Sequence, residues 1–232
     1  MQTPVYDLIV VGAGVVGTFH AYFAALSGAR VLLVERDPAP NEATVRNFGM
    51  VATTTIATPG KWDKYARATS EIYRRLEAEI GEDLTLRKQG SLYLVETEPE
   101  DQVIREFAEL SPRIGKKAWY LDREDVLKEY PFAQPDYVRG GLLLPDDMSV
   151  DPRRFIHILL RHFTKTGLFD YRPHTCIVKV ASAADHCELT DAQGHTWHAD
   201  KTVICCGTEY RILFPDLFRD SPLKISKLQM LL

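Results

Sequence analysis

The sequence predicts an α/β fold, and three observations support this prediction. Residues 6–11 form a short apolar run rich in β-branched residues, a glycine-rich turn follows directly, and 30–35 form a second such run. Runs of this kind are typical of strands buried on both faces of a parallel sheet. The segment 15–27 between them is small and apolar without proline, and Gly28 is placed to end a helix. The chain therefore begins with a βαβ unit, and a further short buried strand is expected at 202–206.

Helical spacing defines the next long element, 61–80. Trp62, Tyr65 and Tyr73 share one helical face, so we expect an amphipathic helix with these aromatic side chains buried. Gly81 is expected to end this helix, because glycine readily adopts the left-handed conformation found at helix C-termini.

The rest of the chain mixes helices and strands. Small polar residues between 43 and 59 favour a functional loop with room for one helical turn, and Asp122 and Asp151 suit the N-caps of two helices. The other expected helices span 98–110, 122–130 and 152–165, and the other expected strands span 91–95, 118–121, 139–144, 175–180, 186–190 and 195–198. The last three strands are expected to form an antiparallel meander, so the chain is α/β at both ends with an α+β insertion between them.

Charge and apolar patterning exclude several classes of protein. The 232 residues carry 28 Lys and Arg against 32 Asp and Glu, a formal charge of −4, with 45% hydrophobic residues. We therefore expect a soluble globular protein that binds neither nucleic acid nor a membrane, since both call for a clustered basic excess. The most apolar stretch, 8–16, is far shorter than the ~18 residues that span a bilayer. No basic segment precedes it, as a secretory signal would require, so we expect a cytoplasmic protein.

Cysteine and histidine show no pattern typical of a metal site. The seven histidines are scattered, and His195 and His198 flank a tryptophan in a strand pattern, so we interpret them as surface or core residues. The four cysteines lack CxxC spacing and are expected to be buried reduced thiols: Cys176, Cys187, Cys205 and Cys206. We expect no metal site.

The turn after the first strand reads Gly-Ala-Gly-Val-Val-Gly, which is a GxGxxG motif. Gly12 allows the tight turn, Gly14 lets the backbone approach a pyrophosphate, and Gly17 lets the helix pack closely on the strand. The amides and the positive dipole end of the following helix then attract phosphate. Glu35 ends the second strand, where a carboxylate binds a ribose hydroxyl pair, and its charge argues against a 2′-phosphate. The motif predicts dinucleotide binding, and both NAD and FAD satisfy it.

A resemblance distinguishes between these two nucleotides. The run Ala43-Thr-Val-Arg-Asn-Phe-Gly49, together with the βαβ unit, resembles the FAD-binding amine oxidoreductases of the D-amino-acid oxidase superfamily, which includes glycine oxidase and sarcosine oxidase. Further segments resemble a subgroup proposed to act in the catabolism of phosphonates such as 2-aminoethylphosphonate: 46–50, 62–63, 90–92, 150–152 and the tail Lys227-Leu-Gln-Met230. The similarity covers essentially the whole chain.

The resemblance implies FAD as the cofactor and a set of residues that hold it. Gly12, Gly14 and Gly17 would hold the pyrophosphate and Glu35 the adenosine ribose. The other implied cofactor-binding positions are Val16, Arg36, Thr44, Arg46, Asn47, Gly49, Val178, Cys206 and Gly207. Positions 44, 46, 47 and 49 match contacts to the phosphates or the isoalloxazine, the backbone at 178 meets the adenine, and 206–207 form a turn beside the cofactor.

Cys206 and Arg46 differ from the other positions in how they are interpreted. Cys206 departs from the commoner alanine or threonine, and we interpret it as a small packing residue and not a redox thiol. Arg46 has two open interpretations. It holds the cofactor phosphates, which we favour, or it meets an anionic group of the substrate, since guanidinium suits a phosphonate.

The resemblance also implies a domain organisation. A Rossmann-type FAD-binding domain with a parallel sheet would comprise 1–86 and 149–214. An interleaved α+β substrate domain with an antiparallel sheet would comprise 87–148, with 215–232 starting a return to it. Because the family continues past the tail motif, we expect this substrate domain to be incomplete here, and the 232 residues alone to bind FAD weakly and turn over poorly.

The implied reaction is oxidation of the C–N bond of a small amine, with hydride transfer to flavin N5 and hydrolysis of the imine to a carbonyl. For the phosphonate subgroup the substrate would be 2-aminoethylphosphonate or an N-alkyl derivative. The sequence identifies no catalytic residue, and it leaves open whether O2 or another electron acceptor is used. Two alternatives remain at this point, which are a non-catalytic or truncated dinucleotide-binding module and an NAD-dependent dehydrogenase.

Overall fold

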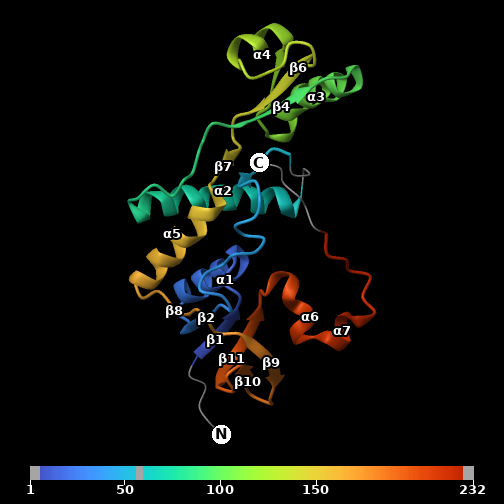
Figure 1. Ribbon diagram of the computed structural model, residues 1–232. Helices are drawn as coiled ribbons and strands as arrows, with labels where there is room; N and C mark the ends of the chain where they lie inside the picture. Colours follow the sequence, from blue (N-terminus) through green and yellow to red (C-terminus); the bar gives the residue numbers. More distant parts are fainter. Residues whose placement is uncertain (1–5, 56–59, 227–232) are drawn as a thin grey trace. The chain divides into compact units, whose positions relative to one another are not determined.

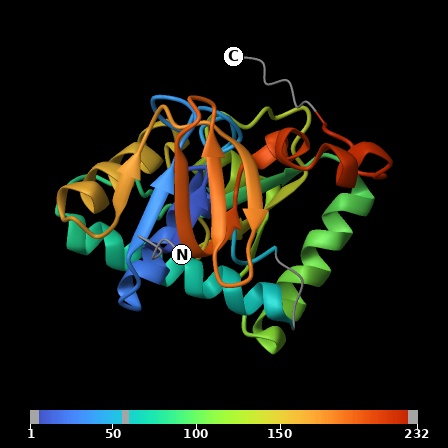
Figure 2. The same ribbon diagram turned by 90° about the horizontal axis from the view of Figure 1, so that it is seen from below.

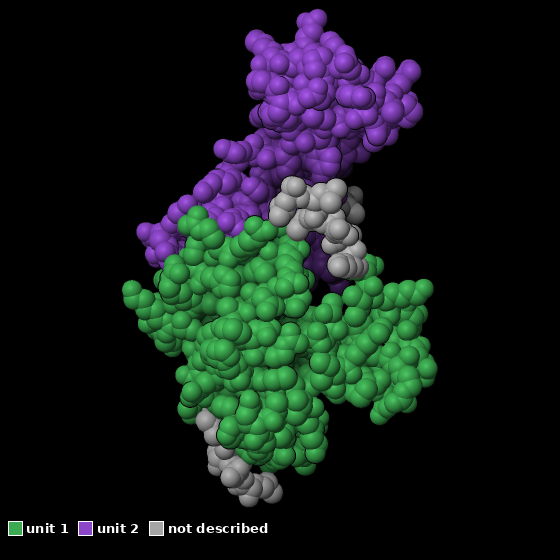
Figure 3. All heavy atoms as spheres, in the orientation of Figure 1, with its two compact units in different colours: residues 1–47, 152–232 green, residues 48–151 purple. Residues whose placement is uncertain are grey.

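A computed structural model describes residues 6–55 and 60–226 (Figure 1). It divides the chain into two compact units, shown in different colours in Figure 3. Unit 1 comprises 1–47 and 152–232, and unit 2 comprises 48–151, so unit 2 is inserted into unit 1 in the sequence. The four functional segments expected from the sequence divide the chain differently and stay a prediction. The tail motif 227–230 lies outside the described residues.

Unit 1 is built on a six-stranded mixed sheet with the order β8-β2-β1-β11-β10-β9. Its strands are β1 (Tyr6–Val11), β2 (Val31–Val34), β8 (Asp170–Arg172), β9 (Ile177–Ser182), β10 (Cys187–Asp191) and β11 (Thr196–Ile204). The pairs from β8 to β11 are parallel, and β11-β10-β9 form the expected antiparallel meander. Figure 2 shows the meander strands in orange beside the blue β1. The predicted α/β class is confirmed, and β8 is a strand that the sequence interpretation did not include.

The strand β11 corrects one expectation. The sequence predicted two separate short strands, 195–198 and 202–206. The structure has one continuous strand, 196–204. Ala199 pairs with Cys187 of β10 on one side and with Tyr6 of β1 on the other, so the backbone passes from one partner to the next without a break.

Helices pack on this sheet in unit 1. Helix α1 (Val15–Leu26) is followed by Gly28 at φ +88°, as its predicted role in ending the helix requires. Helix α5 (Pro152–Lys165) packs against α1, with the rings of Tyr22 and Phe163 stacked 4.8 Å apart. The short helices η2 (Gly207–Glu209), α6 (Tyr210–Leu213) and α7 (Pro215–Arg219) follow β11, and α6 lies against β9. The core under the sheet comprises Tyr6, Ile9, Val11, Leu32, Val34, Ile177, Leu189 and Ala199.

Unit 2 contains a three-stranded antiparallel sheet with the order β4-β6-β5. Its strands are β4 (Ser91–Val95), β5 (Trp119–Asp122) and β6 (Gly140–Leu144), and a two-stranded ribbon pairs β3 (Met50–Val51) with β7 (Met148–Ser149). Its helices are α2 (Lys61–Ile80), α3 (Glu98–Leu110), η1 (Ser111–Ile114) and α4 (Arg123–Glu129). As predicted, Asp122 caps α4 by accepting from the Asp125 amide at 2.9 Å, and Gly81 ends α2 at φ +70°.

Two expectations about burial are wrong. Trp62 and Tyr65 are 74% and 57% exposed. Helix α2 buries Ser70 and Leu76, and the two aromatic rings near its N-terminus pack edge-on against each other, 6.3 Å apart. The four cysteines are free, as expected, but each is only partly buried. They lie at strand ends or at the margin of the core, where small side chains are only partly covered.

Among the helices in the described ranges 6–55 and 60–226, none combines the length and apolar character needed to cross a membrane.

Candidate cofactor-binding site

The ends of three adjacent strands define the candidate site in unit 1. Val11, Val34 and Ile204 are register partners at the carboxyl ends of β1, β2 and β11. The turns that leave these strands are tied to one another, because the Gly12 amide donates to Val34 at 2.8 Å and the Cys205 amide donates to Val11 at 2.7 Å. In open α/β sheets, ligands bind outside the carboxyl ends of the strands. A binding site is therefore expected at this edge.

Close backbone contacts explain the glycines of the turn. A Cβ atom on Gly17 would lie 1.9 Å from the carbonyl oxygen of Gly12, and a Cβ on Gly12 would lie 2.5 Å from that of Cys205. Gly12 also has φ +100°, which side-chain-bearing residues rarely adopt. A Cβ on Gly14 would meet only the Thr44 hydroxyl, at 3.0 Å. Gly12 and Gly17 are thus required by packing, and Gly14 keeps the surface of the turn open.

The N-terminus of α1 presents amides at this turn. The Val15 amide donates to the Thr44 hydroxyl at 3.0 Å. The amides of Val16 and Gly17 have no partner inside the helix, because the first turn of any helix lacks the preceding carbonyls. The helix dipole adds partial positive charge at the same place. This arrangement suits an anionic group such as a pyrophosphate.

Glu35 is held at the end of β2 by two backbone amides. One carboxylate oxygen accepts from Ala13 at 2.8 Å and the other accepts from Asp37 at 3.1 Å. An ionised carboxylate has about four acceptor positions, so about two remain for further donors. A ribose hydroxyl pair supplies two donors, and Glu35 is fixed in position to accept them.

Tyr171 is a neighbour of Glu35 that the sequence interpretation missed. It lies on β8 opposite Leu33 of β2. Its hydroxyl is buried and has no hydrogen-bond partner within the described part of the chain. Burial, together with the negative charge of Glu35, raises its pKa to about 12. The alternating pattern Asp-Tyr-Arg just before Pro173 is the signal that could have identified this strand.

Arg36 connects β2 to the turn after β11. Its guanidinium lies 3.1 Å from Asp37 and 3.5 Å from Glu209, which follows Gly207 in η2. The hydrogen bond to Asp37 raises the pKa of Arg36 above its ordinary value, so the charge is permanent. Gly207 has φ +58° and allows the chain to turn at this point.

Cys205 and Cys206 adjoin the glycine turn through their backbone. Burial raises the pKa of both thiols, so both are neutral at pH 7. Because the thiolate is the reactive form, neutral thiols agree with the interpretation of Cys206 as a packing residue. The sequence interpretation named Cys206 only, whereas the contacts to Gly12 and Gly17 involve Cys205 as well.

The loop after β2 brings further predicted residues to the turn. Thr44 reaches the N-terminus of α1, as described above. The side-chain amide of Asn47 donates to the backbone carbonyl of Thr44 at 2.7 Å. Arg46 lies 3.7 Å from Glu42, and both side chains are more than half exposed. The backbone amides of Val45 and Arg46 both donate to the carbonyl of Glu42. Residues 42–46 therefore form the helical turn expected in this loop.

The structure places the other three predicted residues on different elements. Val178 lies on β9 and is 42% exposed, and Val16 lies in the first turn of α1 with its side chain 60% exposed. Gly49 belongs to unit 2, where its carbonyl accepts from the Val150 amide at 2.8 Å. The cofactor-binding roles of all the residues named from the sequence stay predictions.

The fold and the site define a class of protein. A parallel βαβ unit, a close-packed glycine turn, a helix N-terminus at that turn and a fixed carboxylate after the second strand together form a dinucleotide-binding α/β fold.

A comparison with protein families identifies the family within this class. Residues 7–232 match the family described as DAO, FAD dependent oxidoreductase, and the chain belongs to this family. FAD is the cofactor of the family, which confirms the cofactor expected from the sequence and disfavours an NAD-dependent dehydrogenase.

Individual relatives agree with this result. The chain is 28% identical to glycine oxidase of Bacillus licheniformis over 222 residues, which cover 93% of this chain and 58% of that protein. It is 27% identical to 4-methylaminobutanoate oxidase (formaldehyde-forming) of Paenarthrobacter nicotinovorans, covering 86% of this chain and 24% of the relative. The crystal structure of glycine oxidase from Geobacillus kaustophilus has the same fold, with a TM-score of 0.82 and 22% identity over 91% of this chain and 58% of that one. The chain thus spans less than two thirds of the length of these relatives.

Proposed function

We propose that the protein to which this chain belongs oxidises the C–N bond of a small amine, using FAD as the hydride acceptor. The observation that carries the proposal is the glycine turn with its fixed Glu35, set in a chain of the FAD dependent oxidoreductase family. The relatives described above are named as oxidases of amino acids and amines, which supports this class of substrate.

The residues of the glycine turn fit FAD in a specific way. The amides at the N-terminus of α1 would bind the pyrophosphate, and Glu35 would accept from the adenosine ribose. Arg36 holds the turn at Gly207 in place through Glu209. The isoalloxazine supplies the hydride acceptor when FAD is bound. The chain's own contribution is to bind and orient the cofactor.

For the substrate we propose 2-aminoethylphosphonate or an N-alkyl derivative as the specific form of the amine. The proposal rests on the sequence motifs around Arg46, and none of the relatives described above is named for a phosphonate. An exposed guanidinium is suited to bind a phosphonate group bidentately, and Arg46 is such a group.

Binding of FAD tests the cofactor site directly. We expect the purified 232-residue chain to bind FAD in a fluorescence titration. We expect Glu35→Gln to weaken binding by about 10-fold, because an amide accepts less strongly than a carboxylate and has only one acceptor oxygen. The control is Glu129→Gln, which removes an exposed carboxylate of unit 2. Equal affinities for all three proteins would contradict the role of Glu35, and a chain that binds NAD and not FAD would contradict the proposed function.

The amine is tested by anaerobic mixing of the FAD-loaded full-length protein to which this chain belongs with glycine, sarcosine or 2-aminoethylphosphonate. We expect an amine substrate to bleach the flavin absorbance and to yield an aldehyde or oxo acid. Bleaching by glycine or sarcosine alone would reject the phosphonate substrate and keep the amine class. Tight FAD binding without bleaching by any amine would favour a non-catalytic nucleotide-binding module.

A further inference from the structure

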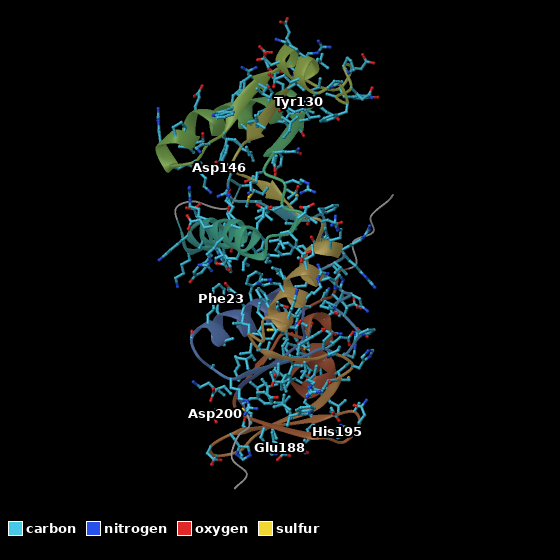
Figure 4. The ribbon with its side chains drawn as sticks, turned by 90° about the vertical axis from the view of Figure 1, so that its left-hand side faces the viewer. Phe23, Tyr130, Asp146, Glu188, His195 and Asp200 are labelled. Carbon is cyan, nitrogen blue, oxygen red and sulfur yellow. The ribbon has the colours of Figure 1, made fainter. Side chains whose placement is uncertain are left out.

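A cluster of three metal-binding side chains lies on the antiparallel meander of unit 1. His186, Glu188 and His198 each offer one ligand atom, and these atoms lie within 4.8 Å of one another. The imidazole rings of His186 and His198 are 5.4 Å apart between centroids. All three side chains are partly buried, which limits competition from bulk water. Figure 4 labels Glu188 on this meander.

Strand register explains why these residues meet. Glu188 of β10 pairs directly with His198 of β11, and His186 lies just before the first residue of β10, two residues before Glu188. Directly paired residues point to the same face of a sheet, and the His186 ring, 5.4 Å from the His198 ring, lies beside them. Leu189 and Ala199, each one residue along, belong to the buried core. The three ligands therefore lie together on the face opposite this core.

The hydrogen bonds of the two histidines leave each ring a nitrogen that could bind a metal ion. His186 Nδ1 lies 2.8 Å from the Asp185 carboxylate, which leaves its other ring nitrogen for an ion. A carboxylate that binds the second nitrogen of an imidazole is the usual partner of a metal-bound histidine, because it orients the ring. His198 Nδ1 is buried and has no hydrogen-bond partner in the described part of the chain. A buried, unpartnered polar atom is costly, and a metal ion would satisfy a group of this kind.

We propose that His186, Glu188 and His198 bind one divalent transition-metal ion of the Zn²⁺ type. Two imidazoles and one carboxylate are a donor set that Zn²⁺ and its neighbours in the first transition series accept. Ligands about 2.1 Å from a tetrahedral ion lie about 3.4 Å apart, so the donor atoms at 4.8 Å must close by at most about 1.4 Å. Side-chain rotation on one hairpin suffices for this. Three protein ligands leave a fourth position for water or another donor.

This inference departs from the sequence interpretation, which treated His198 as a surface or core residue and expected no metal. Spacing in the sequence does not show the cluster, because His198 is ten or more residues from its partners and meets them only through strand pairing. The proposal uses none of the residues assigned to FAD, so it does not rest on the proposed function.

The test is a Zn²⁺ titration of the chelator-treated 232-residue chain by calorimetry. We expect one equivalent to bind, and Glu188→Gln and His198→Ala to weaken binding at least tenfold. Asp185→Asn is expected to weaken binding about 10-fold to 100-fold, which is the usual effect of removing a carboxylate behind a metal-bound histidine. The matched control is His195→Ala, which removes a 71% exposed histidine of the same hairpin and is expected to leave Zn²⁺ affinity unchanged.

A second measurement identifies the ligands and does not depend on a variant that folds. Co²⁺ bound by nitrogen and oxygen in the unmodified chain is expected to show weak visible d–d bands without strong thiolate charge transfer. Absence of binding, an equal loss in His195→Ala and His198→Ala, or thiolate bands that disappear in Cys187→Ser would each overturn the proposal. Binding that is insensitive to Glu188→Gln and His198→Ala would overturn it as well.

Discussion

Single atoms decide how the turn after β1 is built. The absent Cβ of Gly17 leaves room for the carbonyl of Gly12, and no side-chain movement could relieve that contact, because the contacted atom is a backbone oxygen. Gly28 contrasts with this, since a Cβ there would meet nothing within 4 Å. Glycine at 17 is thus required by packing, and glycine at 28 by backbone conformation alone. At Tyr171 a single atom is present where it has no partner, because its buried hydroxyl forms no hydrogen bond within the described residues.

Removal of that hydroxyl gives a prediction at the residue scale. We expect Tyr171→Phe to leave the free energy of unfolding at pH 7 unchanged or raised by up to about 1 kcal/mol, because an unpaired buried polar group is lost. The raised pKa of about 12 means that the unfolded chain loses this proton near pH 10 and the folded chain does not. Stability of the unmodified chain should therefore fall between pH 10 and 12, and less so in Tyr171→Phe. Urea denaturation at pH 7 and pH 11 checks both expectations. A loss of more than 1 kcal/mol at pH 7 would contradict them.

The turn between β10 and β11 is organised at the scale of an element by one carboxylate. Asp191 is 4% exposed. One of its oxygens accepts from the amides of Gln193 and His195, at 3.0 and 2.9 Å, and the other accepts from the side chains of His195 and Trp197. Burial acts to raise the pKa of Asp191, but these hydrogen bonds together lower it. The hairpin that carries the proposed metal site is thus closed by a charged group.

We expect Asp191→Ala to lower the free energy of unfolding at pH 7 by about 2–3 kcal/mol, because four donors lose a buried acceptor. A lowered pKa stabilises the folded state above the ordinary carboxyl pKa, and this contribution is lost as pH falls through the lowered value. The difference in free energy of unfolding between the unmodified chain and Asp191→Ala should therefore become smaller in acid. Denaturant titrations at pH 7 and pH 3 measure it, with Asp200→Ala, an exposed carboxylate of the same hairpin, as the control. Equal effects of the two substitutions would be evidence against this role of Asp191.

At the scale of the whole molecule, the chain relies on contacts between residues far apart in sequence. In unit 2 a single oxygen of Asp147 accepts from the amides of Thr53 and Thr54, at 2.8 and 3.0 Å, and from the Thr53 hydroxyl. Asp147 is fully buried. Lys116 donates to the carbonyl of Thr53 at 2.5 Å and lies 2.7 Å from Asp63. These bonds join the first and last segments of unit 2.

Asp147 therefore gives a prediction for global stability. We expect Asp147→Ala to cost about 2–4 kcal/mol, because three donors lose a buried acceptor. Asp147→Asn keeps the acceptor oxygen, so we expect it to cost less than half as much. Urea denaturation of the three proteins measures the difference. Asp146→Ala is the neighbouring control, since its ion pair with Lys117 is exposed and contributes little. A larger loss for Asp147→Asn than for Asp147→Ala would contradict the assigned role of the acceptor.

Much of the fold could be predicted because its signals are local. The strand, the glycine turn and the helix of the first βαβ unit lie within about 35 consecutive residues, and each is determined by short-range sterics and apolar spacing. The caps at Asp122 and Gly81 act within one helical turn. The family resemblance has the same origin, because the GxGxxG turn and Glu35 are adjacent in sequence to the elements that position them.

Only the tertiary structure decided which distant segments become neighbours. The two predicted strands around Ala199 are one strand because β10 and β1 pair with it on opposite sides. Tyr171 meets Glu35 because β8 joins the edge of the sheet, and His198 meets Glu188 through strand register. The sequence by itself determined the cofactor turn and its family, since those depend on local geometry. The exposure of Trp62 and Tyr65 on α2 and the assembly of the His-Glu-His cluster depend on which distant segments pack or pair, which a linear pattern does not encode.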